Sequence, residues 1–206
     1  MGSPKARKNK IVLGITGGFG TGKTTVAGLF RLANAQLISA DKIAHQIIRP
    51  GARVYKKIIR TFGQRILKKN KLIDRHKLAR LAFNNKKALK KLNLITHPQI
   101  ISIINKEIKT SRSGLVILDA PLLIEAGLAN LVDTLVVVKA QKKQQIARLL
   151  KKTALNKNDI LERIKNQMPL EEKTALADFI IDNSGSIRNT KRQVKRILKE
   201  IKKVSV

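Results

Sequence analysis

The chain has 206 residues, no cysteine and a formal net charge of +31, from 44 basic and 13 acidic residues. Its length suggests one domain with small inserts, and a hydrophobic fraction of 43% argues against a wholly disordered chain. The lack of cysteine excludes a disulfide framework, a thiolate zinc site and a cysteine nucleophile. The basic excess points to an anionic partner: nucleic acid, acidic lipid or a phosphorylated small molecule.

The first part of the chain resembles a secretory signal only briefly. Residues 1–9 predict a solvated basic tail, and the apolar run at 11–13 stops at Gly14. A signal core needs about 7–15 apolar residues, and a membrane-spanning helix needs about 20. We therefore expect a cytoplasmic protein with no membrane partner.

Apolar runs alternate with helical patterns along the chain. Strands are predicted over residues 11–15, 35–39, 115–118, 134–138 and 179–181. The third and fourth runs are continuous rather than alternating, as in a parallel sheet covered on both faces. Helices are predicted over residues 24–32, 142–152, 158–166 and 188–203, with a long helical stretch between the second and third strands. Within that stretch, the step from His97 to Pro98 predicts a new helix that begins with proline.

This order predicts an α/β protein: a five-stranded, mostly parallel sheet covered by helices, with a helical substrate-binding insert and a candidate lid. Residues 1–9 are the expected basic tail. The core is expected to comprise residues 10–41, 112–140 and 178–206, the helical insert residues 42–111, and the lid residues 141–177.

Residues 17–24, Gly-Gly-Phe-Gly-Thr-Gly-Lys-Thr, match the phosphate-loop pattern G-x-x-x-x-G-K-[ST] between a predicted strand and a predicted helix. Glycines let successive backbone N–H groups converge on a polyphosphate, and the helix adds its positive N-terminal dipole. Lys23 can then span the β- and γ-phosphates, and the Thr24 hydroxyl can bind Mg²⁺. The alternative is a glycine-rich turn with an incidental lysine, against which the flanking strand and helix argue. The motif predicts a site for a nucleoside triphosphate without identifying the acceptor.

Two aspartates follow predicted strands, at the sheet edge where α/β proteins bind ligands. Asp41 comes just after the second strand and could orient or deprotonate an acceptor hydroxyl, or cap the helix that follows. Asp119 ends the third strand, where it could lie near Mg²⁺ or shape a turn. Asp133 is interpreted as a turn residue. Asn183, after the fifth strand, could contact a nucleotide base or shape its turn.

Six segments together resemble dephospho-coenzyme A kinase, over a stretch from about residue 10 to residue 201. They are residues 17–25, 40–51, 96–98, 119–125, 163–169 and 177–183. The run Asp-Ala-Pro-Leu-Leu-Ile-Glu at 119–125 and the run Ala-Asp-Phe-Ile-Ile-Asp-Asn at 177–183 are much more specific than the phosphate loop alone.

The resemblance implies transfer of the ATP γ-phosphoryl group to the ribose 3′-hydroxyl of dephospho-coenzyme A, the last step of coenzyme A synthesis. It also implies a P-loop kinase fold, in which the helical insert binds coenzyme A and the lid is mobile. The implied catalytic residues are Asp41, as general base, and Lys23. The implied ATP-binding residues are Gly20, Thr21, Gly22, Lys23, Thr24, Thr25, Arg148, Lys152 and Asn183. The implied substrate-binding residues are Asp41, His97, Pro121 and Leu122, and the implied metal ligands are Thr24 and Asp119.

Some of these residues have simpler interpretations, and two positions depart from the family pattern. His97 could merely cap a helix before Pro98, and the lid residues Arg148, Lys152 and Arg163 could be solvated helix faces. The family usually has aspartate where Ser39 stands and arginine where Lys152 stands. A lysine lacks the planar fork of arginine, so contacts to adenine or phosphate there would be looser.

Two other functions remain open at this stage. The acceptor could be a nucleoside monophosphate or a small hydroxylated acid, or the chain could be a basic P-loop protein that binds nucleic acid. Aromatic residues make up only 3% of the chain, which argues against reading single strands by base stacking. A lysine-rich composition without a function of its own also accounts for the charge. The oligomeric state is not predicted.

Overall fold

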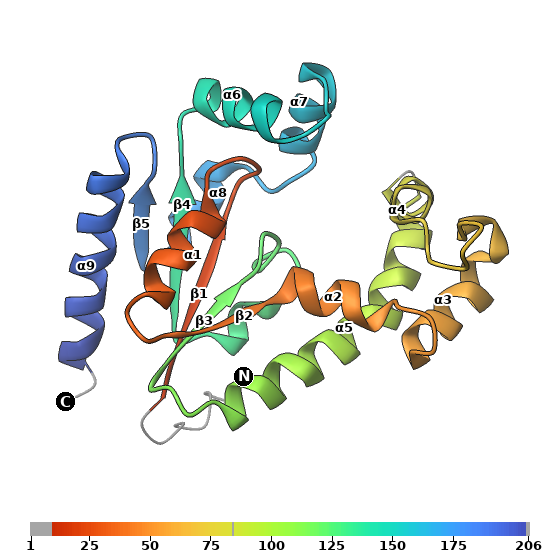
Figure 1. Cartoon of the computed structure of the whole chain (residues 1–206), viewed down its shortest axis with the longest axis horizontal. Helices are drawn as coiled ribbons and strands as arrows, with labels where there is room; N and C mark the ends of the chain where they lie inside the picture. The colour runs from red at the N-terminus through yellow and green to blue at the C-terminus, as the bar shows by residue number, and fades with distance from the viewer. Residues whose placement is uncertain (1–9, 84, 205–206) are drawn as a thin grey trace. The chain divides into compact units, whose positions relative to one another are not determined.

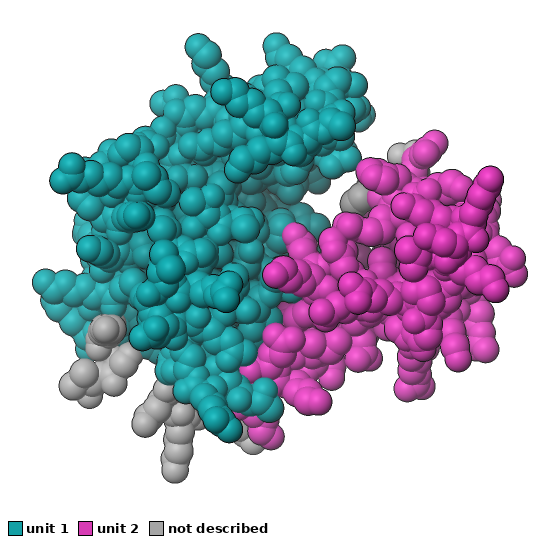
Figure 2. Space-filling model, viewed as in Figure 1, with its two compact units in different colours: residues 1–39, 110–206 teal, residues 40–109 magenta. Residues whose placement is uncertain are grey.

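The computed structural model describes residues 10–83 and 85–204 (Figure 1). The described chain divides into two compact units, coloured separately in Figure 2. One comprises residues 40–109, and the other comprises the residues before and after them. The sheet and the phosphate loop belong to the second of these, which we call the sheet unit. Residues 40–109 are called the helical unit.

The sheet unit is built on five strands that all run parallel, in the order β2-β3-β1-β4-β5. The strands are β1 (Ile11–Gly17), β2 (Gln36–Ser39), β3 (Leu115–Asp119), β4 (Thr134–Lys139) and β5 (Phe179–Asp182). The predicted five-stranded parallel sheet is confirmed. Because β1 lies between β3 and β4, the segments that follow these three strands leave the same edge of the sheet side by side, which is where open α/β folds bind ligands.

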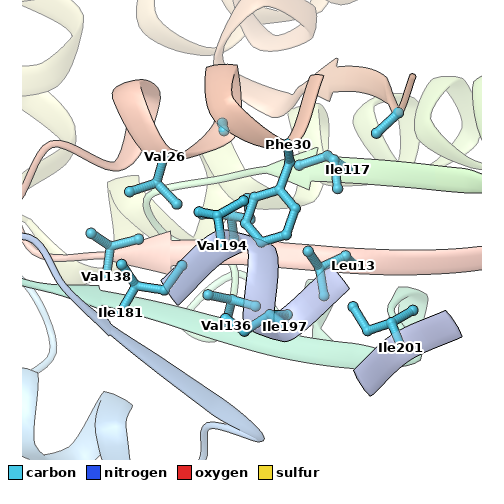
Figure 3. Close-up of a cluster of buried hydrophobic side chains, with 13 residues drawn as sticks. Leu13, Val26, Phe30, Ile117, Val136, Val138, Ile181, Val194, Ile197 and Ile201 are labelled. Carbon is cyan, nitrogen blue, oxygen red and sulfur yellow. The ribbon is translucent and has the colours of Figure 1, made fainter. Parts of the chain in front are cut away.

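Helices α1 (Lys23–Arg31) and α9 (Ile187–Val204) cover one face of this sheet (Figure 3). Phe30 of α1 and Val194 of α9 pack with strand residues such as Leu13 and Val136, and all four are at most 3% exposed. Burial of such side chains contributes about 1.5–3 kcal/mol each. The phosphate loop is thus attached to a strand and a helix that belong to a well-buried core.

The segment between β3 and β4 packs against the other side of the sheet. A Cβ atom added at Gly14 of β1 would lie 2.9 Å from Cδ1 of Leu123 and 2.9 Å from Cγ1 of Val132. Only glycine allows so close an approach. The segment contains one short 3₁₀ helix, η2 (Leu128–Leu131).

Three helices connect β4 to β5: α6 (Lys142–Lys152), α7 (Lys157–Lys165) and α8 (Leu170–Ala175). They include the residues expected to form a lid, and they belong to the sheet unit. Helix α7 begins at Asn156, whose side chain accepts a hydrogen bond from the Asp159 backbone at 2.9 Å. Helix α8 was not predicted, because its six residues are too few for a recognisable helical period.

The helical unit contains α2 (Ala40–Ile47), α3 (Arg53–Phe62), η1 (Gln64–Ile66), α4 (Arg75–Phe83) and most of α5 (Lys86–Thr110). Val54, Ile58 and Ile66 are among its buried residues. Helix α5 has 25 residues. Neither it nor any other helix in the described part of the chain is long and apolar enough to cross a membrane.

The prediction that a new helix begins at Pro98 is wrong, because Pro98 lies inside α5. Proline cannot donate to the carbonyl group of the residue four positions earlier, here Leu94. Leu94 and Pro98 both lie on the exposed side of the helix, where water can satisfy that carbonyl. The nearby Thr96 hydroxyl donates to the Leu92 carbonyl at 2.9 Å. The helix therefore continues through the proline.

Candidate active site

The phosphate loop, residues 17–24, joins β1 to α1 at the ligand-binding edge of the sheet. Gly20 and Gly22 have φ angles of 82° and 84°, a left-handed conformation that favours glycine. Thr21 closes the loop by donating from its hydroxyl to the Gly18 carbonyl at 2.9 Å. Helix α1 has no side-chain cap and no acidic residue in its first turn. The Thr25 N–H already donates to the Gly22 carbonyl at 3.0 Å, so the N–H groups of Lys23 and Thr24 are the ones in the first turn that suit an anion.

Lys23 and Asp119, identified separately in the sequence, form an ion pair through Nζ and Oδ1. Both side chains are largely buried, at 11% and 9% exposure. Strand pairing explains the contact, because Asp119 at the end of β3 is in register with Ile15 of β1, just before the phosphate loop. The Ala120 N–H then bonds to the Ile15 carbonyl at 3.1 Å.

Asn183 ties the phosphate loop to the end of β5 and to α9. Its Nδ2 donates to the Thr21 carbonyl at 2.8 Å, and its Oδ1 accepts a hydrogen bond from the Thr190 hydroxyl at 2.9 Å. All three residues are buried. A Cβ atom on Gly22 would overlap the amide nitrogen of Asn183, so the tie also depends on glycine there. Asn183 supports the loop in this structure, and its contact with a nucleotide stays a prediction.

Arg148 of α6 lies next to the phosphate loop with one nitrogen unused. Its Nη2 donates to the Asn183 carbonyl at 2.8 Å. Its Nη1 is buried and has no hydrogen-bond partner among the described residues, and it would lie 3.7 Å from a Cβ atom on Gly22. Leaving a buried donor unpaired is costly, so this nitrogen fits a site that receives an anion. Lys152, one turn later at the end of α6, is exposed.

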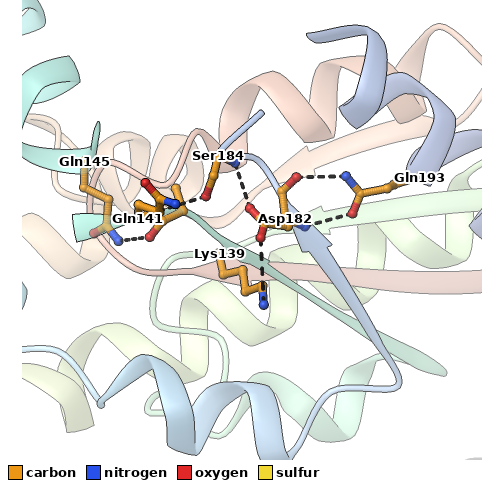
Figure 4. Close-up of polar contacts among 7 residues, drawn as sticks. Lys139, Gln141, Gln145, Asp182, Ser184 and Gln193 are labelled. Carbon is orange, nitrogen blue, oxygen red and sulfur yellow. Dashed lines mark hydrogen bonds and ion pairs between the residues drawn. The ribbon is translucent and has the colours of Figure 1, made fainter. Parts of the chain in front are cut away.

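Polar contacts join the ends of β4 and β5 (Figure 4). They adjoin Asn183, whose carbonyl accepts the hydrogen bond from Arg148. Asp182 accepts a hydrogen bond from the Ser184 N–H at 2.8 Å and lies 3.9 Å from Lys139. The Ser184 hydroxyl bond lowers the pKa of Asp182, assisted by the Ser184 N–H and the Lys139 charge and opposed by burial. Gln193 bonds to both backbone groups of Asp182, and Ser184 accepts from the Gln141 N–H. These bonds fix the start of the segment that carries Arg148.

Two residues of the segment between β4 and β5, Gln167 and Arg163, contact Phe19 at the tip of the phosphate loop. Gln167 Oε1 accepts a hydrogen bond from the Phe19 N–H at 2.8 Å, and the Arg163 guanidinium carbon lies 5.8 Å from the centre of the Phe19 ring. The latter distance is within the range of a cation–π interaction. Arg163 was among the expected lid residues. The role of Gln167 was missed, although it lies in the segment 163–169 that carries the family resemblance.

Thr24 and Asp119 are the predicted metal ligands. One lies in the first turn of α1 and the other at the end of β3, both beside the phosphate loop. No group of three or more histidine, cysteine, aspartate or glutamate residues that could hold a metal exists among the described residues. A hydroxyl, one carboxylate and substrate phosphates are the ligands that Mg²⁺ commonly takes in phosphoryl-transfer sites. The residues present therefore fit Mg²⁺ bound together with a nucleotide.

Asp41 belongs to the helical unit and lies in the first turn of α2, two residues after β2 ends. It does not precede the helix, so the capping alternative is wrong. Its negative charge stabilises the N-terminal end of α2, where the helix dipole is positive. His45 follows one turn later. Burial and then the Arg75 charge lower the pKa of His45, while the Asp41 charge opposes them.

His97 lies within α5 and is half-buried, so the alternative that it caps a helix is also wrong. Burial lowers the pKa of His97. Its side chain lines an open hollow of about 390 Å³ along α5. Lys86, Lys90 and Asn93 also line this hollow, together with Leu89, Leu94 and Pro98, and its surface is mostly apolar.

Pro121 and Leu122, the remaining predicted substrate residues, follow Asp119 in the sheet unit. The Pro121 carbonyl accepts hydrogen bonds at 3.0 Å from both the Thr16 hydroxyl and Lys173 Nζ. Leu122 is 43% exposed. The involvement of Lys173 was missed, because nothing in a lysine's sequence neighbourhood indicates that it is buried.

A phosphate loop between the central strand and its helix, with a lysine–aspartate pair and an arginine beside the loop, defines a P-loop nucleotide-binding protein. Comparison with known proteins specifies the family. The dephospho-CoA kinase family model matches residues 11–189. The chain belongs to the dephospho-CoA kinase family and is therefore a kinase.

Individual relatives agree with this assignment over nearly the whole chain. A dephospho-CoA kinase of Carboxydothermus hydrogenoformans is 43% identical over 194 residues, covering 93% of this chain and 94% of that protein. A crystal structure from Thermus thermophilus is 31% identical with a TM-score of 0.84, covering 94% of this chain and 98% of that one. Dephospho-CoA kinase from Campylobacter jejuni is 32% identical with a TM-score of 0.63, covering 95% and 98% respectively.

Proposed function

We propose that this kinase transfers the γ-phosphoryl group of ATP to the 3′-hydroxyl of the ribose of dephospho-CoA, with CoA and ADP as products. The observation that carries the proposal is the match of the dephospho-CoA kinase family model to residues 11–189. The buried, unpartnered Nη1 of Arg148 beside the phosphate loop supports the ATP side of the reaction. It gives the loop an unused donor where a nucleotide phosphate would lie.

ATP would bind through the phosphate loop. The N–H groups of Gly20–Thr25 would surround the β-phosphate, and Lys23 would bridge to the γ-phosphate. Arg148 would add a charge-assisted hydrogen bond through Nη1, with Lys152 one turn further along α6. Asn183 would hold Thr21, and with it the loop, in place. This support lets the loop bind a triphosphate without reorganising.

Mg²⁺ would be held by the Thr24 hydroxyl, Asp119 and the nucleotide phosphates. When bound, it would neutralise charge that develops on the β- and γ-phosphates. Ser39 of β2 is in register with Asp119 of β3, and adjacent residues of neighbouring strands share a face. The aspartate usual in the family at this position would put a second carboxylate beside Asp119. With Ser39, the chain would hold Mg²⁺ with one fewer negative charge nearby.

On the acceptor side, Asp41 would accept a hydrogen bond from the 3′-hydroxyl and orient its oxygen toward the γ-phosphorus. The new bond joins that oxygen to phosphorus while the bond from phosphorus to the β,γ-bridging oxygen breaks, and ADP leaves with the electron pair. The hydroxyl proton passes to the Asp41 carboxylate. His97, with Pro121 and Leu122, would contact the rest of the acceptor.

An acceptor panel tests the proposal. The full chain is incubated with ATP and Mg²⁺ and with dephospho-CoA, a nucleoside monophosphate or a small hydroxylated acid, and ADP release is followed by a coupled assay. We expect ADP to be released only with dephospho-CoA and no turnover with the Lys23→Ala variant. NMR of the product should show the new phosphate on the 3′-oxygen. Turnover with another acceptor and none with dephospho-CoA would refute the proposal.

A further inference from the structure

Lys173 is a fully buried charge that the chemistry above does not use. It lies in α8, its side chain is 0% exposed, and its Nζ forms an ion pair with Glu125 Oε1 at 2.8 Å. Burial of an ammonium group is costly even when the group is paired. Apolar residues of the same volume often stabilise a protein as well or better. Stability alone therefore does not account for this pair.

The partners of Lys173 lie in the segment that carries the predicted metal and substrate residues. Besides Glu125, Nζ donates to the Pro121 carbonyl at 3.0 Å. The same carbonyl accepts from the Thr16 hydroxyl of β1 at 3.0 Å, next to the phosphate loop. Lys173 thus holds both ends of the turn that follows Asp119, at Pro121 and at Glu125.

Glu125 extends these contacts to the tip of the phosphate loop. Its Oε1 also accepts a hydrogen bond from the Met168 N–H at 3.3 Å. The neighbouring Gln167 holds the Phe19 N–H at 2.8 Å. A continuous path therefore runs from Pro121 through Lys173, Glu125 and the segment 166–169 to Phe19, within the sheet unit.

We propose that the Lys173–Glu125 pair is a positioning device for phosphoryl transfer. It fixes the turn 120–125, which would face the acceptor, relative to the phosphate-loop tip, which would face the γ-phosphate. Neither residue touches a reacting atom, so both are positioning residues. The proposal rests on the kinase reaction proposed above and adds two residues to which that proposal assigns no role. Misplacing reacting groups by 1 Å can cost about 100-fold in rate, which makes such a device useful.

Two variants separate positioning from packing. In Glu125→Gln with Lys173→Met, no charge remains buried alone, so we expect the double variant to melt close to the parent. Gln167→Ala removes the hydrogen bond from the Phe19 N–H, the final step of the path, and leaves the Lys173–Glu125 pair intact. We expect kcat to fall by about 10- to 100-fold in both variants. The KM for ATP should stay within about threefold, because Lys23 and Arg148 are untouched.

Amide hydrogen exchange provides a measurement that does not require dephospho-CoA or turnover. The Phe19 N–H should exchange faster in both variants than in the parent, because its acceptor is lost in one and loosely held in the other. Glu200→Gln is the matched control, since it removes a carboxylate from an exposed ion pair with Arg196 on α9. It should change neither kcat nor exchange at Phe19.

The outcomes separate this proposal from the proposed function. A parent enzyme inactive with dephospho-CoA refutes the function, and slow exchange at Phe19 in both variants would then refute the positioning path as well. A folded double variant with parental kcat shows that the pair only packs the interior, and overturns the proposal. If the double variant does not fold, Gln167→Ala decides, and parental kcat in that variant overturns the proposal in the same way.

Discussion

Replacing Gly22 by alanine should destabilise the sheet unit and abolish ATP binding. The residue has φ 84°, and a non-glycine residue in the left-handed region costs about 1–2 kcal/mol. The new Cβ atom would also overlap the amide of Asn183, which would have to move and release the Thr21 carbonyl. A buried polar group left unsatisfied costs about 1–3 kcal/mol. Together these terms predict a loss of about 2–5 kcal/mol in the free energy of unfolding.

Gly28→Ala provides a matched control in α1, the helix that directly follows Gly22. Gly28 lies in the interior of α1, and an added Cβ would meet nothing within 4 Å. Alanine in such a position should stabilise the helix by about 0.5–1 kcal/mol. Urea unfolding followed by circular dichroism measures both changes, and calorimetry with ATP measures binding. Equal stabilities for Gly22→Ala and Gly28→Ala, or unimpaired ATP binding by Gly22→Ala, would refute this reasoning.

Two further predictions concern the helical unit. Asp41→Asn should lower kcat by about 10²- to 10⁴-fold in the coupled ADP assay with little change in the KM for ATP, and a variant with the parental rate would remove Asp41 from the chemistry. Burial lowers the pKa of His97 in the folded chain, so the unfolded chain binds the proton more readily. Stability should therefore fall as pH drops from about 6.5 toward the folded pKa, and His97→Gln should flatten this dependence. An imidazole that titrates at or above its ordinary pKa in an NMR titration would contradict the prediction for His97.

Local patterns in the sequence were enough to predict the sheet and the phosphate loop. The fixed spacing of the glycines in residues 17–24 indicated the phosphate loop. The continuous apolar runs at 115–118 and 134–138 indicated a sheet covered on both faces. Parallel strands then place Asp119 beside the loop without further information. These features depend on residues near one another in the chain, or on the small number of connections that parallel strands allow.

The supporting contacts could not be predicted, because they join residues far apart in the chain. Asn183 and Thr21 are separated by 162 positions, and Phe19 and Gln167 by 148. Nothing in the sequence near Lys173 distinguishes a buried lysine from the many exposed ones. The error at Pro98 has a different origin. A local rule predicted a helix start, and the solvent-exposed position of the proline made its missing hydrogen bond tolerable.

The charges around the phosphate loop suggest how the site prepares for its ligand. In the present structure Lys23 is neutralised by Asp119, and Arg148 uses only one side of its guanidinium group. We expect a bound triphosphate to offer Lys23 new partners, which would free the Asp119 carboxylate for a cation that arrives with the nucleotide. In that exchange Lys23 and Asp119 would each keep a counter-charge, so neither would be left alone in a partly buried site. We therefore predict that the ion pair between Lys23 and Asp119 breaks when a nucleotide and its cation bind.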